Sequence, residues 1–250
     1  MAPQLAGGFA GAGRRRLPRR RPGSARLLAG CAARSGDARQ LCLRQAGGRC
    51  DRIAGAAGHD GKRFHLVGHD WGGQVAWGVA GKHPDRLASL TVLSRPHPKS
   101  FRRALLKEDG DQKHRSRHHR AFLDAETGKM LLADNARRLR DGMFGQGVPA
   151  EAMDQHLSVL GNPAALEAAL AWYRANVGLA ADIGSITVPT LYIWGDVDAT
   201  VGPDAAHGTR EFVGATFAME VLPGVGHFVM DQAADTATAL MLAHFRKHPV

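Results

Sequence analysis

The first 58 residues of the chain lack most of the residue types that build a folded core. They contain no valine, tyrosine, tryptophan, histidine or lysine, and only one isoleucine, one phenylalanine and two acidic residues. A segment with so few β-branched and aromatic side chains cannot form buried strands, and it has little apolar surface to offset the entropy lost on folding. We therefore expect residues 1–58, which are rich in arginine, glycine and alanine, to be disordered or irregular.

Acidic residues are scarce in the same segment, whereas arginine is abundant. Its 12 arginines give it the whole formal net charge of +10, because residues 59–250 hold 21 basic and 21 acidic side chains. The run RRRLPRRR at 14–21 could bind nucleic acid or an anionic surface. No interleaved aromatic residues and no recognisable binding module accompany it, so we expect no nucleic-acid partner.

Targeting signals give two further interpretations of this segment. Its arginine-rich, acid-poor start resembles a transit peptide, and LLAGC at 27–31 imitates the end of an export signal. The export interpretation lacks the apolar core of about 7–15 residues that such a signal needs. The composition also fits a GC-rich coding region translated in a shifted frame, which we keep as a hypothesis about its origin.

Long apolar runs and paired cysteines are absent from the whole chain. No segment reaches the roughly 20 apolar residues of a membrane span, so we expect no membrane association and a cytoplasmic location. Cys31, Cys42 and Cys50 have neither the spacing of metal ligands nor an even count. They therefore predict no metal site and no disulfide framework.

Strand-like and helix-like segments alternate from residue 59 onward. Apolar runs predict buried strands at 64–67, 89–94, 190–194 and 219–222. Helical spacing predicts a helix that ends before Pro84, and others at 100–107, 127–143, 149–160, 162–176 and 233–245. This order predicts an α/β fold with a parallel sheet and right-handed crossovers. We expect residues 59–97 and 188–250 to form its core and residues 98–187 a helical cap.

The sequence FHLVGHDWGGQ at 64–74 has the strand, glycine turn and helix of a nucleophile elbow, but Asp70 stands where G-x-S-x-G has serine. A serine alkoxide suits attack on an acyl carbon. A carboxylate is already ionised at neutral pH, and it can displace a leaving group from an sp³ carbon. The alternative interpretation is a glycine-rich turn with a solvated Asp70.

Two further candidates follow later strands. Asp198 comes after the strand at 190–194, and His227 comes after the strand at 219–222. The order nucleophile, acid, histidine is that of one known class of catalytic triad. Asp196 would point to the opposite side of its strand, and Asp231 is a weaker substitute for the acid. Any one of these residues could instead be a capping residue or a structural histidine.

Residues 59–250 resemble the α/β-hydrolase fold family, in the branch of epoxide hydrolases and haloalkane and haloacetate dehalogenases. The resemblance rests on VGHDWGG, LSRPHP, ALAWYRAN, PTLYIWGDVD and LPGVGHF. It implies that Asp70 is the nucleophile, that Asp198 orients His227, and that the N–H of Trp71 is an oxyanion donor. It also implies a helical cap, a small-molecule substrate and no cofactor.

Residues of the predicted cap indicate which leaving group the site could stabilise. Epoxide hydrolases protonate the epoxide oxygen with cap tyrosines, which Tyr173 matches by resemblance, although it shares a helical face with buried-type leucines. His118 and His119 stand near the second donor position, where they could polarise an epoxide, contact a halide or carboxylate, or be solvated members of a basic run. We favour epoxide hydrolysis, with dehalogenation as the alternative.

One part of the family pattern is missing before the elbow. Members of this fold have further strands there, and a His-Gly-x-Pro loop that gives the second oxyanion donor. Residues 1–58 supply neither, so we expect these strands to be missing or replaced and the strand at 64–67 to be a sheet edge. Loss of one oxyanion donor costs about 10²–10³ in kcat. A catalytically impaired fragment or binding module is therefore the third alternative.

Overall fold

A four-stranded sheet forms the centre of the molecule. The computed structural model describes residues 61–175 and 183–250, so the predictions made for residues 1–58 lie outside the described residues. The strands are β1 (Phe64–His69), β2 (Leu87–Leu93), β3 (Thr190–Gly195) and β4 (Phe217–Leu222). They run parallel in the order β1-β2-β3-β4. All four predicted strands are confirmed, and β1 lies at one end of the sheet formed by the described residues.

The inner strands explain why the sequence shows continuous apolar runs. Every residue of β2 and of β3 is buried, whereas β1 and β4 both have exposed positions. Strands covered on both faces have no solvent side, so they do not alternate between apolar and polar residues. The runs SLTVL and TLYIW therefore mark the middle of the sheet.

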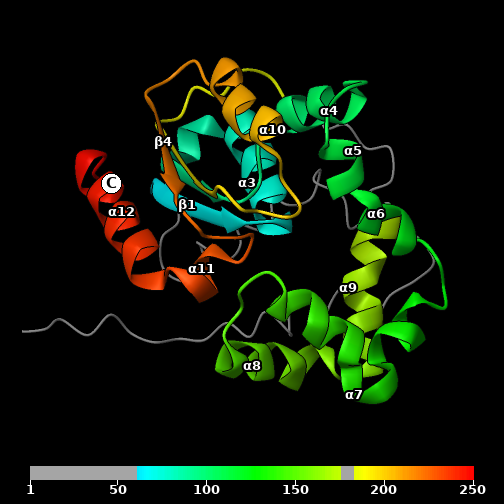
Figure 1. The fold of residues 1–250 in the computed structure, drawn as a ribbon. Helices are drawn as coiled ribbons and strands as arrows, with labels where there is room; N and C mark the ends of the chain where they lie inside the picture. The colour runs from blue at the N-terminus through cyan, green and yellow to red at the C-terminus, as the bar shows by residue number, and fades with distance from the viewer. Residues whose placement is uncertain (1–60, 176–182) are drawn as a thin grey trace, which may run out of the picture.

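Helices cover both faces of this sheet (Figure 1). Those that cover it are α3 (Trp71–Lys82), α4 (Pro98–Leu106) and α10 (Pro203–His207) on one face, and α12 (Ala234–Lys247) on the other. Alternate strand residues point to opposite faces. Val92 and Tyr192 accordingly pack with Trp77 of α3, whereas Leu93 packs with Ala237 of α12.

The remaining helices connect these elements. Short turns are η2 (Pro84–Arg86), α5 (Gln112–Arg115), α6 (Arg117–Ala121), η3 (Gly208–Phe212) and α11 (Val229–Gln232). Longer helices are α7 (Thr127–Phe144), α8 (Ala150–Leu160) and α9 (Pro163–Ala175). None of the helices in the described ranges is both long and apolar enough to cross a bilayer.

The three long helices α7, α8 and α9 lie together, apart from the sheet (Figure 1). Residues of α7 and α8 share a small apolar cluster that includes Met143, Met153 and Leu157. Asn162 caps the N-terminus of α9, because its Oδ1 accepts a hydrogen bond from the N–H of Ala164 at 2.9 Å. These helices form a unit over one end of the sheet, although the exact boundaries of core and cap remain a prediction.

Two helices differ from the sequence prediction. The predicted single helix at 127–143 is wrong in its middle, because Asp134, Asn135 and Ala136 have positive φ angles and break α7. In addition, α4 inserts Phe101 into the core of the sheet, although the sequence placed it in the cap. The helical spacing of apolar residues does not predict either difference, because both depend on how the helices pack in the fold.

Candidate active site

Asp70 occupies a strained turn between β1 and α3. It is the N-cap residue of α3 and has φ 48° and ψ −118°. Such a conformation costs a non-glycine residue on the order of 1–3 kcal/mol, so the surrounding structure must enforce it. The N–H of Asp70 donates to the carbonyl of Leu93 at 3.2 Å, and the N–H of Gln74 donates to the carbonyl of Asp70 at 3.0 Å. The backbone thus has the geometry of a nucleophile elbow.

Glycine is required at two positions of this turn because the backbone passes close to its neighbours. A Cβ at Gly68 would lie 2.4 Å from the carbonyl oxygen of Gly72, and one at Gly73 would lie 2.8 Å from side-chain carbons of Val92 and Arg95. The strained angles themselves fall on Asp70. The glycines therefore provide space for the turn between strand and helix.

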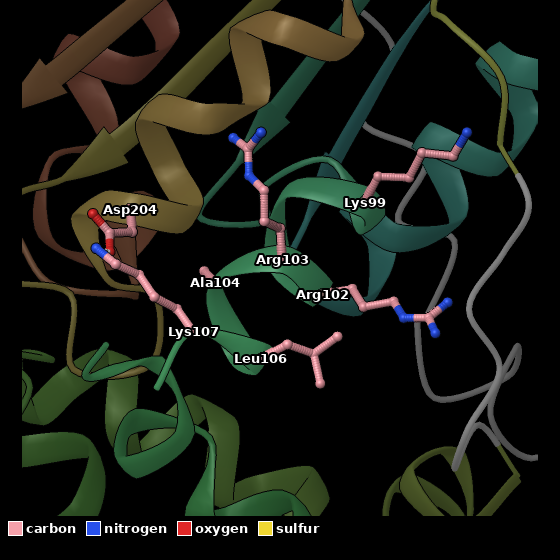
Figure 2. A pocket seen from close by; sticks show the side chains of 7 residues that line it. All are labelled: Lys99, Arg102, Arg103, Ala104, Leu106, Lys107 and Asp204. Carbon is pink, nitrogen blue, oxygen red and sulfur yellow. Dashed lines mark hydrogen bonds and ion pairs between the residues drawn. The ribbon is translucent and has the colours of Figure 1, made fainter. Parts of the chain in front are cut away.

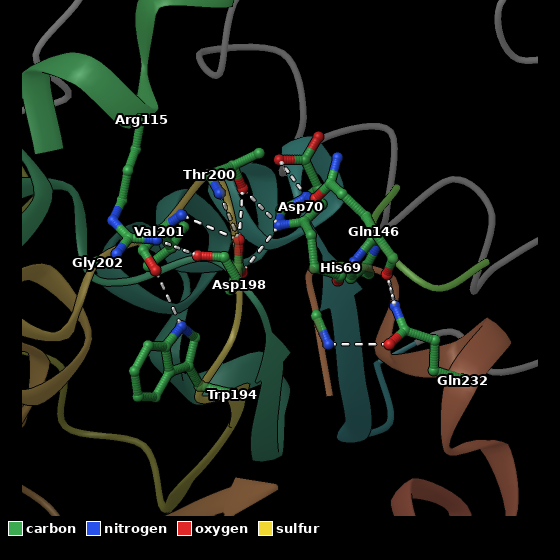
Figure 3. A network of polar contacts seen from close by, with 12 residues as sticks. His69, Asp70, Arg115, Gln146, Trp194, Asp198, Thr200, Val201, Gly202 and Gln232 are labelled. Atoms are coloured by element: carbon green, nitrogen blue, oxygen red, sulfur yellow. Dashed lines mark hydrogen bonds and ion pairs between the residues drawn. The ribbon is translucent and has the colours of Figure 1, made fainter. Parts of the chain in front are cut away.

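Asp198 lies beside His227, at the end of β3. Its side chain is fully buried, and its Oδ2 is 3.0 Å from His227 Nδ1. Its Oδ1 accepts hydrogen bonds from the backbone N–H groups of Thr200 at 2.7 Å and Val201 at 3.0 Å (Figure 3). Three partners therefore fix this carboxylate in one orientation.

The two alternative acids point elsewhere. Asp196 Oδ1 accepts from the N–H of Gly224 at 2.7 Å, in an exposed position. Asp231 Oδ2 lies 3.1 Å from Nε2 of His156 in α8. Neither contacts His227, so Asp198 is the acid that the geometry supports.

His227 connects the two carboxylates. Its Nε2 is 3.4 Å from Asp70 Oδ1, and its side chain is 8% exposed. Burial opposes charge on the ring, but Asp198 and Asp70 outweigh it and raise the pKa of His227 to about 10. Burial alone would raise the pKa of Asp70, yet His227 and Arg95 hold that pKa below its usual range. At neutral pH the site therefore contains a carboxylate beside an imidazolium.

Thr200 and His69 also contact this group, and the sequence analysis did not identify them. Thr200 Oγ1 lies 2.8 Å from Asp198 Oδ1 and 2.7 Å from His227 Nδ1. His69 Nε2 lies 2.8 Å from the carbonyl oxygen of His227. An Asp followed by Thr two residues later is typical of an Asx turn, so Thr200 had a local signal, whereas His69 had none.

Helices α6 and α9, in the predicted cap, bring their predicted site residues against Trp71 and Asp70. The ring of Trp71 lies 5.2 Å from that of Tyr173 and 6.2 Å from that of His119, measured between centroids. The rings of His118 and His119 lie 6.1 Å and 5.4 Å from Tyr173. All four residues line one cavity of about 940 Å³ together with Asp70 and His227. Residues from four distant parts of the sequence therefore share this site.

Burial determines the protonation of the cap residues. It raises the pKa of Tyr173, with a further increase from Asp70, so the phenol keeps its proton. Burial lowers the pKa of His118, and together with His118 and Arg95 it lowers that of His119 to about 4. Both imidazoles are therefore neutral at neutral pH, and each has only one N–H to donate.

A second hollow, of about 750 Å³, lies over α4 (Figure 2). It is lined mainly by cations, among them Arg103, which pairs with Glu211 at 2.6 Å, and Lys107, which pairs with Asp204 at 2.8 Å. None of the candidate residues lines it. Within the described ranges, no group of three or more His, Cys, Asp or Glu side chains is arranged to hold a metal ion. The cavity at Asp70 is therefore the candidate active site.

Comparison with known proteins shows the family to which the chain belongs. Residues 5–239 match the Alpha/beta hydrolase family. The chain belongs to the α/β-hydrolase family. The match begins at residue 5, so it includes most of the segment that the sequence resemblance left out.

Several of the similar proteins are epoxide hydrolases. Epoxide hydrolase 4 of Mus musculus is 26% identical over 193 residues, which are 73% of this chain and 54% of that protein. The chain thus spans about half the length of this curated relative. An epoxide hydrolase from metagenomes of hot environments has a TM-score of 0.68 and 25% identity, over 85% of this chain and 77% of that one. The Bacillus megaterium epoxide hydrolase has a TM-score of 0.69 at 20% identity, over 82% and 78%, and shows the shared fold.

Proposed function

We propose that the chain is an epoxide hydrolase that forms a covalent ester on Asp70. The observation that carries the proposal is the line of contacts from Asp198 through His227 to Asp70, at 3.0 Å and 3.4 Å, inside a cavity that Tyr173 also lines. This arrangement combines an ionised nucleophile, a base for the second step and an acid for the leaving group. The epoxide hydrolases among its relatives support the same substrate class.

In the first step, a carboxylate oxygen of Asp70 attacks a ring carbon of the epoxide and the carbon–oxygen bond of the ring breaks. The resulting alkoxide takes the hydroxyl proton of Tyr173. Although burial raises the pKa of Tyr173, an alkoxide is a far stronger base than a phenolate, so the transfer stays favourable. The product of this step is a hydroxyalkyl ester of Asp70.

His118 is a poor second donor for that oxygen. Its Nδ1 lies 3.2 Å from the carbonyl oxygen of Arg115, which can only accept a hydrogen bond, so Nδ1 carries the proton. The neutral ring then has no proton on Nε2. Among the cap histidines, His119 is therefore the better candidate to assist Tyr173.

Formation of the ester prepares His227 for the second step. Asp70 loses its negative charge, and with it one of the two carboxylates that raise the pKa of His227. The imidazolium then releases its proton, which restores the hydroxyl of Tyr173 through solvent. Neutral His227 takes a proton from a water that attacks the ester carbonyl, while the N–H of Trp71 stabilises the oxyanion. As this intermediate collapses, protonated His227 gives its proton to the leaving alkoxide and the diol departs. The acid left on Asp70 then passes its proton to His227, which regenerates the carboxylate and the imidazolium.

Turnover of a styrene-oxide-like epoxide tests the proposal. Asp70→Ala should abolish activity, whereas Asp85→Asn, which removes an exposed carboxylate, should not change it. His227→Gln should still form the ester but not hydrolyse it, so intact-protein mass should rise by the mass of one epoxide. An active enzyme in which His227→Gln yields no adduct would contradict the covalent mechanism.

Haloacetate in the same assay separates the alternative functions. Tyr173 beside Asp70 favours an epoxide, because a halide leaves without a proton and needs no phenol. Faster turnover of the haloacetate than of the epoxide would show a dehalogenase. A folded protein that turns over neither substrate would show the impaired fragment or binding module.

A further inference from the structure

Arg95 is a buried cation that touches no reacting atom in the proposed chemistry. It lies two residues after the end of β2, and only 7% of its surface is exposed. Its Nε donates to the neutral side chain of Gln74 at 3.1 Å. Within the described residues, no carboxylate forms an ion pair with it. A buried charge without a direct ion pair is costly, and Arg95 is compensated only by the more distant charge of Asp70, so a ligand could complete its pairing.

The guanidinium lies in the wall of the active-site cavity. Its central carbon is 5.3 Å from the ring centre of Trp71 and 4.6 Å from that of Phe101. Both rings and Arg95 itself line the cavity that contains Asp70. The charge of Arg95 lowers the pKa of Asp70 and of His119, so the cation acts on both walls of the cavity.

Asp70 balances this charge only in the resting enzyme. Once Asp70 is an ester and His227 is neutral, the cavity keeps the positive charge of Arg95 and has lost the anion that faced it. An anionic group on the substrate would restore the balance during that part of the cycle. A guanidinium offers two parallel N–H groups, which match the two oxygens of a carboxylate.

Besides Arg95 and Asp70, three arginines and two aspartates line the cavity. Arg117 and Arg138 line it and are exposed. Arg117 Nη1 contacts His114 at 2.7 Å, and Arg138 Nη1 contacts the sulfur of Met130 at 3.7 Å. Neither is ion-paired with a described carboxylate. Cations at the cavity wall attract an anionic substrate from solution.

We propose that Arg95 binds a carboxylate of the substrate, so that this site takes epoxides that carry an acid group next to the ring. The inference rests on the proposed function and adds the class of epoxide. Arg95 is then a specificity residue, placed on the strand side of the cavity opposite the donors of the cap.

A matched pair of substrates tests this assignment. Steady-state kinetics compare 2,3-epoxy-3-phenylpropanoate with its primary amide, which has the same shape and no charge. We expect the protein to prefer the acid by at least about tenfold in kcat/KM. Arg95→Gln should lower kcat/KM for the acid by about 30- to 1000-fold, mainly through KM, and change that of the amide by less than about threefold. The control Arg102→Gln, an exposed arginine of α4, should behave as the unchanged protein.

Arg95→Lys keeps a cation in the cavity wall. It provides a second test in case Arg95→Gln does not fold. Because lysine lacks the planar pair of donors, we expect a loss of about fivefold or more for the acid and none for the amide. Equal losses on both substrates, or no preference for the acid in the unchanged protein, would overturn the proposal. Equal losses on the acid and the amide would mean that Arg95 acts only by keeping Asp70 ionised.

Binding of unreactive ligands separates this proposal from the proposed function. Calorimetry on the full chain compares 3-phenylpropanoate with 3-phenylpropanamide. The acid should bind more tightly, and Arg95→Gln and Arg95→Lys should weaken it selectively. If neither epoxide is hydrolysed, the proposed function fails, yet selective binding of the acid still supports the carboxylate site. Equal binding of acid and amide would overturn the site even in an active enzyme.

Discussion

The active-site cavity has two walls that are built in different ways. Asp70 and His227 lie in one wall, on the loops after β1 and β4, and Asp198 is buried against His227 on the loop after β3. His118, His119 and Tyr173 form the other wall, on α6 and α9. The first wall is held by backbone strain and by hydrogen bonds to buried groups. The second is held by contacts between rings.

This difference separates two functions. The strand wall contains the charges that make and break the ester, and each is fixed by neighbours that cannot move independently. The cap wall contains side chains that are neutral at neutral pH. We therefore expect substitutions in the strand wall to abolish chemistry on every substrate, and those in the cap wall to act through the leaving group.

Among the substitutions that compare the two walls, Asp198→Asn should lower kcat the most. An amide no longer holds His227 in the tautomer that exposes a basic Nε2, and loss of the orienting acid in other triads lowers kcat about 10⁴-fold. Asp196→Asn is the matched control, because it changes a neighbouring carboxylate yet keeps the oxygen that accepts from Gly224. Steady-state kcat measures both. A loss below about tenfold in Asp198→Asn would contradict its role.

The strand wall could be predicted from the sequence because topology determines it. The carboxyl ends of parallel strands meet at one edge of a sheet, so motifs at the ends of three strands predicted a common site. Alternation could not separate Asp198 from Asp196, because residues two apart in a strand point to the same side; the turn that follows Gly195 separates them. Family resemblance alone drew attention to Tyr173, His118 and His119.

Features that depend on side-chain packing could not be predicted from the sequence. Nothing in the run LSRPHP indicates that Arg95 turns into the cavity between two aromatic rings, because that depends on how α3 and α4 approach β2. The break in α7 likewise arises at residues with no glycine or proline to mark it. Arg95, which the sequence alone would leave as a surface arginine, therefore became a candidate only once the fold was known.

In the cap wall, Tyr173→Phe should have the next largest effect. Without the phenol proton, the epoxide oxygen leaves as an alkoxide, and removal of a general acid costs about 10²–10⁴ in rate. Stopped-flow measurement of ester formation isolates this step. Tyr192→Phe is the control, because this buried hydroxyl of β3 has no hydrogen-bond partner among the described residues. Equal rates for Tyr173→Phe and the unchanged protein would exclude Tyr173 as the acid.

The pH dependence of ester formation tests whether His227 controls the ionisation of Asp70 in the strand wall. Only ionised Asp70 attacks, and His227 and Arg95 hold its pKa below the usual range, so the rate should stay constant as the pH falls from 7 to 4. In His227→Gln, the neutral side chain no longer favours the carboxylate. The pKa of Asp70 should then rise, and the rate of adduct formation should decline within that range. Identical profiles for the two proteins would show that the contact between His227 and Asp70 does not control the nucleophile.

The smallest effect should come from His118→Gln. Glutamine can donate an N–H to the carbonyl of Arg115, as the histidine does, and neutral His118 has no second proton to lose. We expect kcat/KM to change by less than about threefold, whereas His119→Phe, which removes the N–H donor, should lower it by about tenfold, the cost of one hydrogen bond of roughly 1.4 kcal/mol. If His118→Gln were the more damaging of the two, its Nε2 would have to carry the proton, and the bond to Arg115 would have to break when substrate binds. The cap wall would then rearrange during the reaction while the strand wall stays in place.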